Sequence, residues 1–281
     1  MYFNTIYVIE SLPSNEWKTG SDLYRDVIEP EVSKRRDIFS IFIQVHDKAD
    51  FFEALEWIIK NSWNNARGPL LHIECHGAKN GLTLASDDFV SWKELKPFLI
   101  RLNVQCRLNL LVVLAACKGA YVLNTIDLTD CAPVWGLIGP KDDVWNVELF
   151  EDLSAFYSEI IASQNGRLSL ERLNGQPLGP NSRYLFTPVE MSFRRIYKLY
   201  LETQTTKRAL RRRENSIVKM ITRKKRIGPG QERLIRSSLK QELRNHEKRF
   251  AEHKMKFFFI DLIPENESRF LISFADLKVL H

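Results

Sequence analysis

The strongest constraint on this chain is an unbroken apolar run that ends in a cysteine and a glycine, Leu110-Leu111-Val112-Val113-Leu114-Ala115-Ala116-Cys117-Lys118-Gly119. An apolar run before a turn signal is typical of a strand that is buried on both faces of a sheet. Open α/β sheets bind their ligands at the carboxyl ends of such strands. The pattern therefore places the Cys117 thiol where a nucleophile is expected. The alternative is that Cys117 is a small buried apolar residue.

A second stretch has the same form and ends in a histidine. It reads Pro69-Leu70-Leu71-His72-Ile73-Glu74-Cys75-His76-Gly77. If both strands end at one edge of a single sheet, an imidazole and a thiol meet there, which is the pairing that nucleophilic cysteine chemistry requires. Because His72 lies inside the strand and His76 lies at its end, His76 is the expected partner of Cys117.

These two motifs, in this order, resemble those of the caspase-like (clan CD) cysteine peptidases. The segment Ala115-Ala116-Cys117 lacks the glutamine of true caspases, so the bacterial CHAT and caspase-like domains are the closer comparison. The resemblance covers roughly residues 1–200. It implies that Cys117 is the nucleophile, that His76 is the acid and base, and that the backbone N–H groups of Gly77 and Cys117 form the oxyanion hole. It also implies a thiol protease of prokaryotic antiviral defence or regulated cell death.

Hydrophobic period and turn signals predict that strands alternate with helices along the first two hundred residues. We expect strands over residues 4–10, 39–45, 70–75, 110–116 and 132–140, an edge strand over 183–187, and a small hairpin of 81–84 with 88–92. Asp47 and Ser91 are expected to cap the helices that follow them, and Glu94 completes a capping box with Ser91. This alternation predicts an α/β fold with a mostly parallel sheet and helices on both of its faces.

The distribution of charge divides the chain into two parts. The 281 residues carry a formal net charge of +6, yet residues 207–256 hold 18 Lys and Arg against 5 Asp and Glu. A chain of this length accommodates one large domain and an extension. We therefore expect a caspase-like peptidase domain over residues 1–205 and a basic C-terminal extension over 206–281. The extension is predicted to be helical and to end in a short β-hairpin of residues 256–263 and 269–274.

The basic extension predicts a negatively charged partner. Its clusters, Arg211-Arg212-Arg213 and Arg223-Lys224-Lys225-Arg226, suit nucleic acid, an anionic membrane surface or an acidic protein. The alternative is a solvated helical face without a ligand. In addition to the protein substrate, we expect a regulatory protein partner, or nucleic acid bound through residues 207–256.

Substrate specificity is expected to depend on acidic residues near the same edge of the sheet. Asp142 and Asp143 follow the predicted fifth strand. By resemblance to the family, the loop after this strand helps to form the pocket for the residue before the scissile bond. Acidic groups there would select Arg or Lys. Alternatively, either aspartate caps the next helix. Glu10, after the first strand, is a second candidate.

Several other classes of protein are excluded by composition. No apolar run approaches the ~20 residues of a membrane span, and no signal peptide is recognised, so we expect a cytoplasmic protein with reduced thiols. The cysteines have no CxxC spacing, and we expect neither a metal nor a cofactor. Cys106 and Cys131 precede strands, at the wrong edge of the sheet, and Cys75 should face away from His76.

The primary prediction is therefore a cysteine endopeptidase that cleaves a protein substrate and is controlled by a partner or ligand. The alternative, from a different class, is a catalytically silent caspase-like scaffold that binds a protein partner or nucleic acid through its basic region. A third prediction combines the two, as a peptidase that nucleic acid activates.

Overall fold

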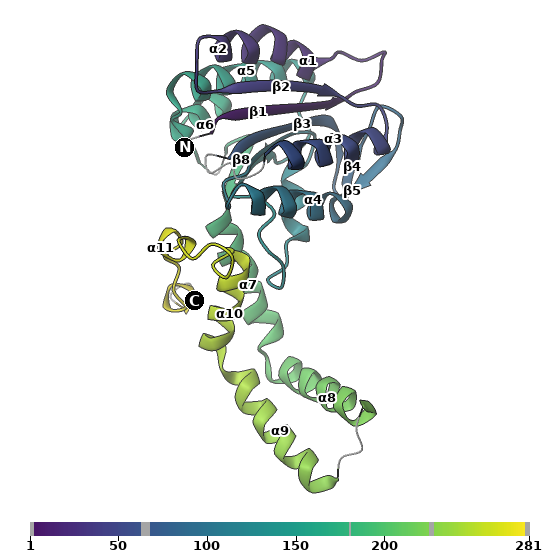
Figure 1. The fold of residues 1–281 in the computed structure, drawn as a ribbon, viewed down its shortest axis with the longest axis vertical. Coiled ribbons are helices and arrows are strands. Elements are labelled where there is room, and N and C mark those ends of the chain that lie inside the picture. Colours follow the sequence, from purple (N-terminus) through teal and green to yellow (C-terminus); the bar gives the residue numbers. More distant parts are fainter. Residues whose placement is uncertain (1–2, 63–67, 180, 225–227, 279–281) are drawn as a thin grey trace. The chain divides into compact units, whose positions relative to one another are not determined.

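The protein, described by a computed structural model over residues 3–62, 68–179, 181–224 and 228–278, divides into two compact units (Figure 1). The first unit comprises residues 1–126 and 132–189, and the second comprises residues 127–131 and 190–281. The sequence analysis placed its boundary after residue 205. Most of helix α7 (Val189–Gln204) accordingly belongs to the second unit.

A mostly parallel sheet forms the centre of the first unit. Its strands follow the order β2-β1-β3-β6-β7-β8, and β8 runs antiparallel to β7. Their bounds are β1 (Thr5–Ser11), β2 (Phe39–Gln44), β3 (Pro69–Ala78), β6 (Leu111–Ala115), β7 (Gly136–Pro140) and β8 (Tyr184–Pro188). Beyond the sheet, β3 continues into a hairpin with β4 (Gly81–Thr83) and β5 (Phe89–Ser91). The predicted α/β class, edge strand and small hairpin are confirmed.

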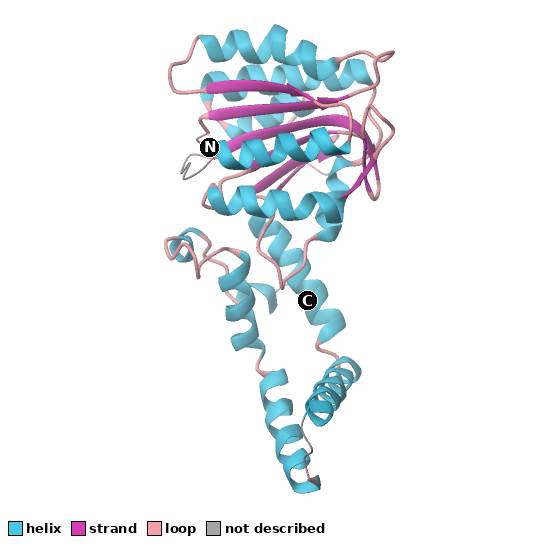
Figure 2. Ribbon diagram, turned by 45° about the vertical axis from the view of Figure 1, so that its right-hand side comes forward, coloured by secondary structure: helices cyan, strands magenta, loops and turns pink. Residues whose placement is uncertain are grey.

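Helices cover both faces of this sheet, as Figures 1 and 2 show. One face carries α3 (Lys48–Asn61) and α4 (Trp92–Gln105). The other carries α5 (Asn146–Ser163), α6 (Gly166–Asn174) and the consecutive helical segments α1 (Thr19–Leu23), η1 (Tyr24–Ile28) and α2 (Glu29–Ser33). Along β6, Val112 and Leu114 enter the first core, whereas Leu111 and Val113 enter the second. Burial on both faces explains why this strand is apolar without interruption.

Local signals fix where two of these helices begin. The Asp47 carboxylate accepts hydrogen bonds from the amides of Ala49 and Asp50 at the start of α3. At the start of α4, Ser91 and Glu94 form the predicted capping box. A side-chain cap of this kind typically contributes about 1 kcal/mol. Both helices therefore begin where the sequence predicts.

The second unit contains helices and turns, and no strand occurs among its described residues (Figure 2). After α7 follow α8 (Lys207–Lys224), α9 (Pro229–Arg244), α10 (His246–Phe257), α11 (Asn266–Arg269) and α12 (Ala275–Lys278). Phe193 of α7 packs against Phe250, Phe257 and Phe258, with ring centroids 5.0–5.7 Å apart. Across the described parts of both units, no helix is both long and apolar enough to span a bilayer.

The predicted C-terminal β-hairpin is wrong for the described residues. Residues 256–263 finish α10 and continue as turns, and residues 270–273 form no strand. Phe258 stacks on Phe270, with ring centroids 4.7 Å apart, and Asn266 donates a hydrogen bond from Nδ2 to the Phe258 carbonyl. Burial in the aromatic cluster around Phe193 thus takes the place of strand pairing for these apolar residues.

Within the extension that the sequence predicts to be helical, residues 231–254 belong to two helices. Asn245 separates α9 from α10, and its Oδ1 accepts a hydrogen bond from the Lys248 amide, 3.1 Å away. Asparagine is a preferred N-cap because its side chain satisfies an amide that the first helical turn leaves unpaired. A second helix, α10, therefore begins directly after α9 ends.

Candidate active site

The two motif strands lie side by side in the sheet. β3 and β6 pair in parallel, with Glu74 opposite Ala115. His76 lies two residues beyond Glu74 in β3, and Cys117 lies two residues beyond Ala115, directly after the end of β6. The His76 side chain is 50% exposed and Cys117 is partly buried. The structure therefore brings both members of the predicted dyad to one edge of the sheet.

Gly77 allows the backbones of the two motifs to touch. A Cβ at position 77 would overlap the Cys117 carbonyl oxygen and would lie 2.7 Å from the Cys117 amide nitrogen. Every other residue carries a Cβ, so glycine alone fits this contact. The two amides that were predicted to bind the oxyanion consequently belong to backbone segments that are in direct contact.

A tight turn presents Cys117 at the end of its strand. The Gly119 amide donates to the Ala116 carbonyl over 3.0 Å, and this bond closes a turn with Cys117 and Lys118 at its centre. Lys118 has a φ of +58°, as the third position of a type II turn requires. This conformation costs a non-glycine residue about 1–2 kcal/mol. Such conformations occur where the surroundings hold the backbone, and functional sites are frequent examples.

The loop after β7 clamps this turn. Lys118 Nζ lies 2.8 Å from Asp143 Oδ1, and the Lys118 amide donates to the Asp142 carbonyl over 3.4 Å. The Lys118 ammonium, with a smaller contribution from the Cys117 thiol, holds the pKa of Asp143 below its usual value. The pair is exposed, so it adds little to stability. Its effect at the site is to place a carboxylate beside the thiol.

The same loop settles one of the sequence alternatives. The N-cap of α5 is Trp145, so neither Asp142 nor Asp143 caps that helix. Asp143 directs its charge to Lys118 and Cys117, whereas Asp142 contributes its backbone carbonyl. Their predicted part in substrate binding stays a prediction.

A carboxylate that the sequence analysis did not select holds His76. Glu16 lies in the loop between β1 and α1, and its Oε1 and Oε2 are 3.1 and 2.9 Å from Nε2 of His76. Donation from Nε2 to a carboxylate leaves Nδ1 as the nitrogen that can exchange a proton. A usable signal was present in the sequence, because Glu16 follows the first strand on the edge where His76 and Cys117 end.

Two buried glutamates lie on neighbouring strands, one row before His76. Glu10 of β1 is opposite Glu74 of β3, and Glu74 is two residues before His76. Glu10 Oε1 accepts a hydrogen bond from the Ser21 amide over 2.9 Å, and Glu10 Oε2 has no partner within the part of the chain that is described. Burial raises the pKa of Glu10, and the nearby Glu74 carboxylate raises it further. Glu10, the second specificity candidate, is therefore covered in this structure.

His72 belongs to the same buried network and not to the edge of the sheet. Its Nε2 lies 3.0 Å from Glu74 Oε2, and its Nδ1 lies 3.0 Å from the Tyr157 hydroxyl. Burial raises the pKa of Tyr157 well above its usual value, so the phenol donates to Nδ1 while Nε2–H donates to Glu74. Thr19 of α1 donates a further hydrogen bond to Glu74. This network fixes the strand that carries His76.

The pKa values of the other three thiols are raised by burial. Cys75 and Cys106 are buried in the core beneath α3 and α4, where burial raises the pKa of both, that of Cys106 to about 12. The prediction that Cys75 faces away from His76 is thereby confirmed. Cys131 belongs to the second unit, and partial burial raises its pKa also.

Comparisons with protein-family models and with curated proteins find no match. Over the residues that the structure describes, no group of three or more His, Cys, Asp and Glu side chains could hold a metal ion. The function is therefore argued from the geometry around His76 and Cys117.

Proposed function

We propose that this protein is a caspase-like cysteine endopeptidase in which Cys117 is the nucleophile and His76 is the acid and base. The observation that supports it best is the contact between the two motifs. Gly77 packs directly on the Cys117 backbone, and Glu16 holds the imidazole of the preceding residue. A nucleophile, a base and a group that orients the base are the three parts that such catalysis combines.

In the proposed reaction, the imidazole of His76 first takes the proton of the Cys117 thiol. The Cys117 thiolate attacks the carbonyl carbon of the scissile bond and forms a C–S bond. The C–N bond then breaks, and the leaving amine takes a proton from the His76 imidazolium. Water, activated by His76, hydrolyses the thioester, releases the carboxylic acid product and restores the thiol. The thiolate is the reactive form, and general acid–base catalysis by one positioned group contributes about 10²–10⁴-fold.

The amides of Gly77 and Cys117 are the proposed donors to the oxyanion that forms during this attack. The two backbone segments are in contact, so both amides can donate a hydrogen bond to one carbonyl oxygen of the substrate. Losing one donor of this kind typically costs about 3 kcal/mol of barrier. Exclusion of a Cβ at position 77 is what preserves the arrangement.

Acidic side chains near the dyad support a basic residue before the scissile bond. Asp143 lies beside Cys117, and Glu10 and Glu74 lie on neighbouring strands, one row before His76. In this structure Asp143 forms an ion pair with Lys118. Residues of α1 cover both glutamates, because Thr19 donates a hydrogen bond to Glu74 and the Ser21 amide donates one to Glu10. A substrate Arg or Lys would replace such internal contacts, which fits an enzyme that a partner or ligand controls. A place in antiviral defence or cell death belongs to the same proposal.

The test is cleavage of a diverse peptide library by the full chain, read by mass spectrometry. Wild type is compared with Cys117→Ala and with Cys131→Ala, the matched variant of the other partly exposed thiol. We expect cuts after Arg or Lys that vanish in Cys117→Ala and persist in Cys131→Ala. Cuts that survive in Cys117→Ala would overturn the proposal.

Absence of any cut needs a second measurement. Incubation with an activity-based acyloxymethyl ketone peptide would then show whether Cys117 forms a thioether in a His76-dependent manner. Labelling that is the same in wild type and in His76→Ala would overturn the proposed dyad and favour the scaffold alternative.

A further inference from the structure

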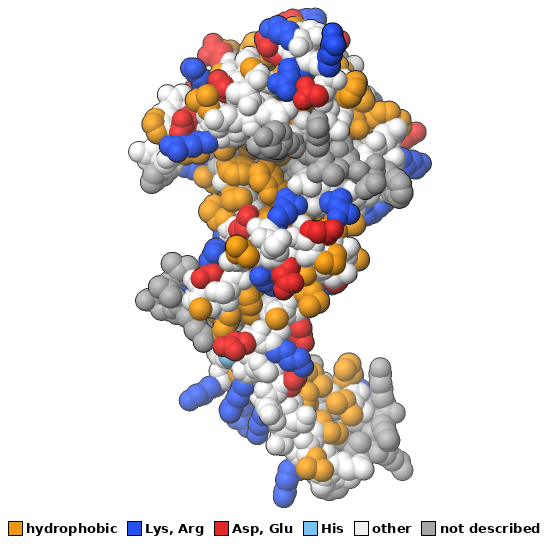
Figure 3. All heavy atoms as spheres, turned by 60° about the vertical axis from the view of Figure 1, so that its left-hand side comes forward, with side chains coloured by type: hydrophobic (Ala, Val, Ile, Leu, Met, Phe, Trp, Pro, Cys, Tyr) orange, Lys and Arg blue, Asp and Glu red, His pale blue; other side chains and the backbone are white. Residues whose placement is uncertain are grey.

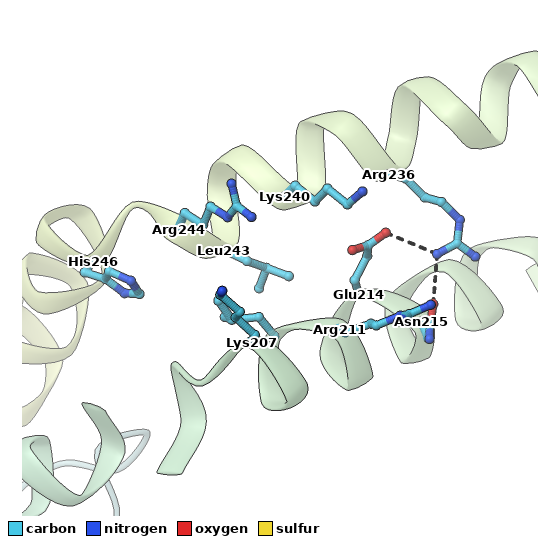
Figure 4. A pocket seen from close by; sticks show the side chains of 10 residues that line it. Lys207, Arg211, Glu214, Asn215, Arg236, Lys240, Leu243, Arg244 and His246 are labelled. Atoms are coloured by element: carbon cyan, nitrogen blue, oxygen red, sulfur yellow. Dashed lines mark hydrogen bonds and ion pairs between the residues drawn. The ribbon is translucent and has the colours of Figure 1, made fainter. Parts of the chain in front are cut away.

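The second unit contains a cationic groove between α8 and α9 (Figure 4). The groove has a volume of about 820 Å³. Its lining includes Lys207 and Arg211 of α8 and Arg236, Lys240 and Arg244 of α9. Arg236 points across the groove toward Glu214 of α8 (Figure 4). Glu214 is the one acidic side chain in the lining described. The groove therefore carries a formal excess of four positive charges when His246 is neutral.

One of these cations holds the two helices together. Arg236 Nη1 lies 3.2 Å from Glu214 Oε1 and 2.9 Å from Asn215 Oδ1, both on α8. Arg236 Nε also donates to Glu232, one turn earlier on α9. Glu214 is 7% exposed, so this pair is partly desolvated. Arg236 and Glu214 thus have internal partners, and neither is counted as a ligand-binding group.

The other four cations remain for a ligand. Lys207, Arg211, Lys240 and Arg244 are exposed. In the described part of the chain, none of the four makes an ion pair. Like charges facing one another across a groove repel, and this repulsion is relieved when an anion enters. An anionic ligand therefore explains the arrangement of these four cations better than a contribution to the packing of α8 against α9 does.

The spacing of the cations indicates a ligand with regularly repeated charge. Of the four cations that remain for a ligand, Lys240 and Arg244 are four residues apart on α9, and Lys207 and Arg211 are four residues apart on α8. Four residues of helix advance about 6 Å, a separation that successive phosphates of an extended strand can follow. Figure 3 shows further Lys and Arg side chains projecting from the second unit.

The residues that line the groove also favour nucleic acid over an acidic protein as its ligand. In protein–protein interfaces most of the binding free energy comes from a few anchors in fully desolvated pockets, whereas the four cations that remain for a ligand in this groove are exposed. In the described lining, the apolar side chains are those of Leu210, which is partly buried, and Leu243, which is buried, and no Phe, Tyr or Trp contributes. A duplex, whose major groove alone is about 12 Å wide, does not fit inside a groove of about 820 Å³ and could contact only its rim. We infer that the α8–α9 groove binds single-stranded nucleic acid through its phosphates, without preference for base sequence.

The test is binding of a fluorescent single-stranded oligonucleotide of mixed sequence to the full chain, followed by anisotropy over a series of salt concentrations. Contact with four phosphates predicts a slope of log K against log[salt] of about −3, since each contact contributes about −0.7 on a single strand. Binding is independent of Cys117 chemistry, so its outcome is separate from that of the proposed peptidase. A duplex of the same sequence should bind more weakly.

Matched variants separate the groove from overall charge. The double variant Arg211→Gln/Lys240→Gln removes one cation of the groove from each helix. The control, Lys219→Gln/Arg233→Gln, removes one exposed cation from each of the same helices outside the lining. We expect the first to lower affinity at least tenfold and to reduce the slope by about 1.4, and the second to have a clearly smaller effect.

Three results would overturn the inference. The first is an equal loss in both double variants, which would indicate attraction by net charge alone. The second is binding of a poly-glutamate peptide of equal length and charge with the same affinity, which would indicate an acidic protein segment. The third is a duplex that binds as tightly as the single strand.

Discussion

Nε2 of His76 lies 2.9 Å from Oε2 of Glu16, so a carboxylate from the loop after β1 orients the imidazole at the end of β3. We expect Glu16→Gln to lower kcat by about tenfold or more, part of the 10²–10⁴-fold that a positioned acid–base group supplies, and to leave KM nearly unchanged. Glu16→Asp should recover part of the loss. Steady-state kinetics on the best peptide of the library provides the measurement.

Glu29→Gln is the matched control for Glu16, because Glu29 is an exposed glutamate of the same unit that lies on α2. It should have wild-type kinetics. If Glu16→Gln raises KM and leaves kcat unchanged, the carboxylate contributes to substrate binding and not to the orientation of His76.

Gly77→Ala should abolish cleavage and destabilise the first unit. The added Cβ would overlap the Cys117 carbonyl oxygen, and the backbones must separate to admit it. Overpacking of this kind typically costs about 1–3 kcal/mol. Gly179→Ala is the control, since its Cβ would meet one atom at 3.9 Å. Urea unfolding and peptide cleavage, measured on both variants, check the prediction, and an active Gly77→Ala enzyme would contradict it.

The four thiols should react with iodoacetamide in a defined order. A thiolate forms as pH rises through the thiol pKa, so a raised pKa moves reactivity to higher pH. Burial raises the pKa of Cys75, Cys106 and Cys131, that of Cys106 to about 12. Between pH 7 and pH 9 we therefore expect Cys117 to be alkylated first, Cys131 later, and the two buried thiols only after unfolding.

Peptide mapping by mass spectrometry at timed intervals measures this order. Cys117→Ala should abolish the fastest phase without changing the rate at Cys131. Faster alkylation of Cys131 than of Cys117 in the native protein would be evidence against an activated thiol at the sheet edge.

Glu10→Gln should stabilise the protein at neutral pH and have less effect in acid. The pKa of Glu10 is raised by burial, so the folded state holds its proton to higher pH than the unfolded state does. Below the pKa of the unfolded state, Glu10 is protonated in both states and does not lower the free energy of unfolding. Above the pKa of the folded state, its buried charge lowers the free energy of unfolding by the full amount. An unsatisfied buried polar atom, as Glu10 Oε2 is, costs about 1–3 kcal/mol.

Urea midpoints at pH 4 and pH 8 provide the comparison for Glu10→Gln. The stability gain should be larger at pH 8. Glu53→Gln, on exposed surface of α3, should show the same small difference at both pH values. A gain that is larger at pH 4 would contradict the sign of the argument.

Much of the first unit could be predicted from the sequence because its signals are local. The caps at Asp47 and Ser91, the apolar run before Cys117 and the hairpin after Ala78 each depend on neighbouring residues. The edge location of His76 and Cys117 also follows from local patterns, because parallel strands that feed helices all end on one side.

Contacts between distant residues were decided only by tertiary structure. The sequence does not say that Glu16 would reach His76, 60 residues away, or that Asp143 would pair with Lys118 instead of capping α5. The segment 256–263 shows the same limit. Its apolar residues are compatible with a strand and with an aromatic core. They belong to the core because Phe257 and Phe258 pack against Phe193. Periodicity records which residues are buried, whereas the partner that buries them depends on the whole fold.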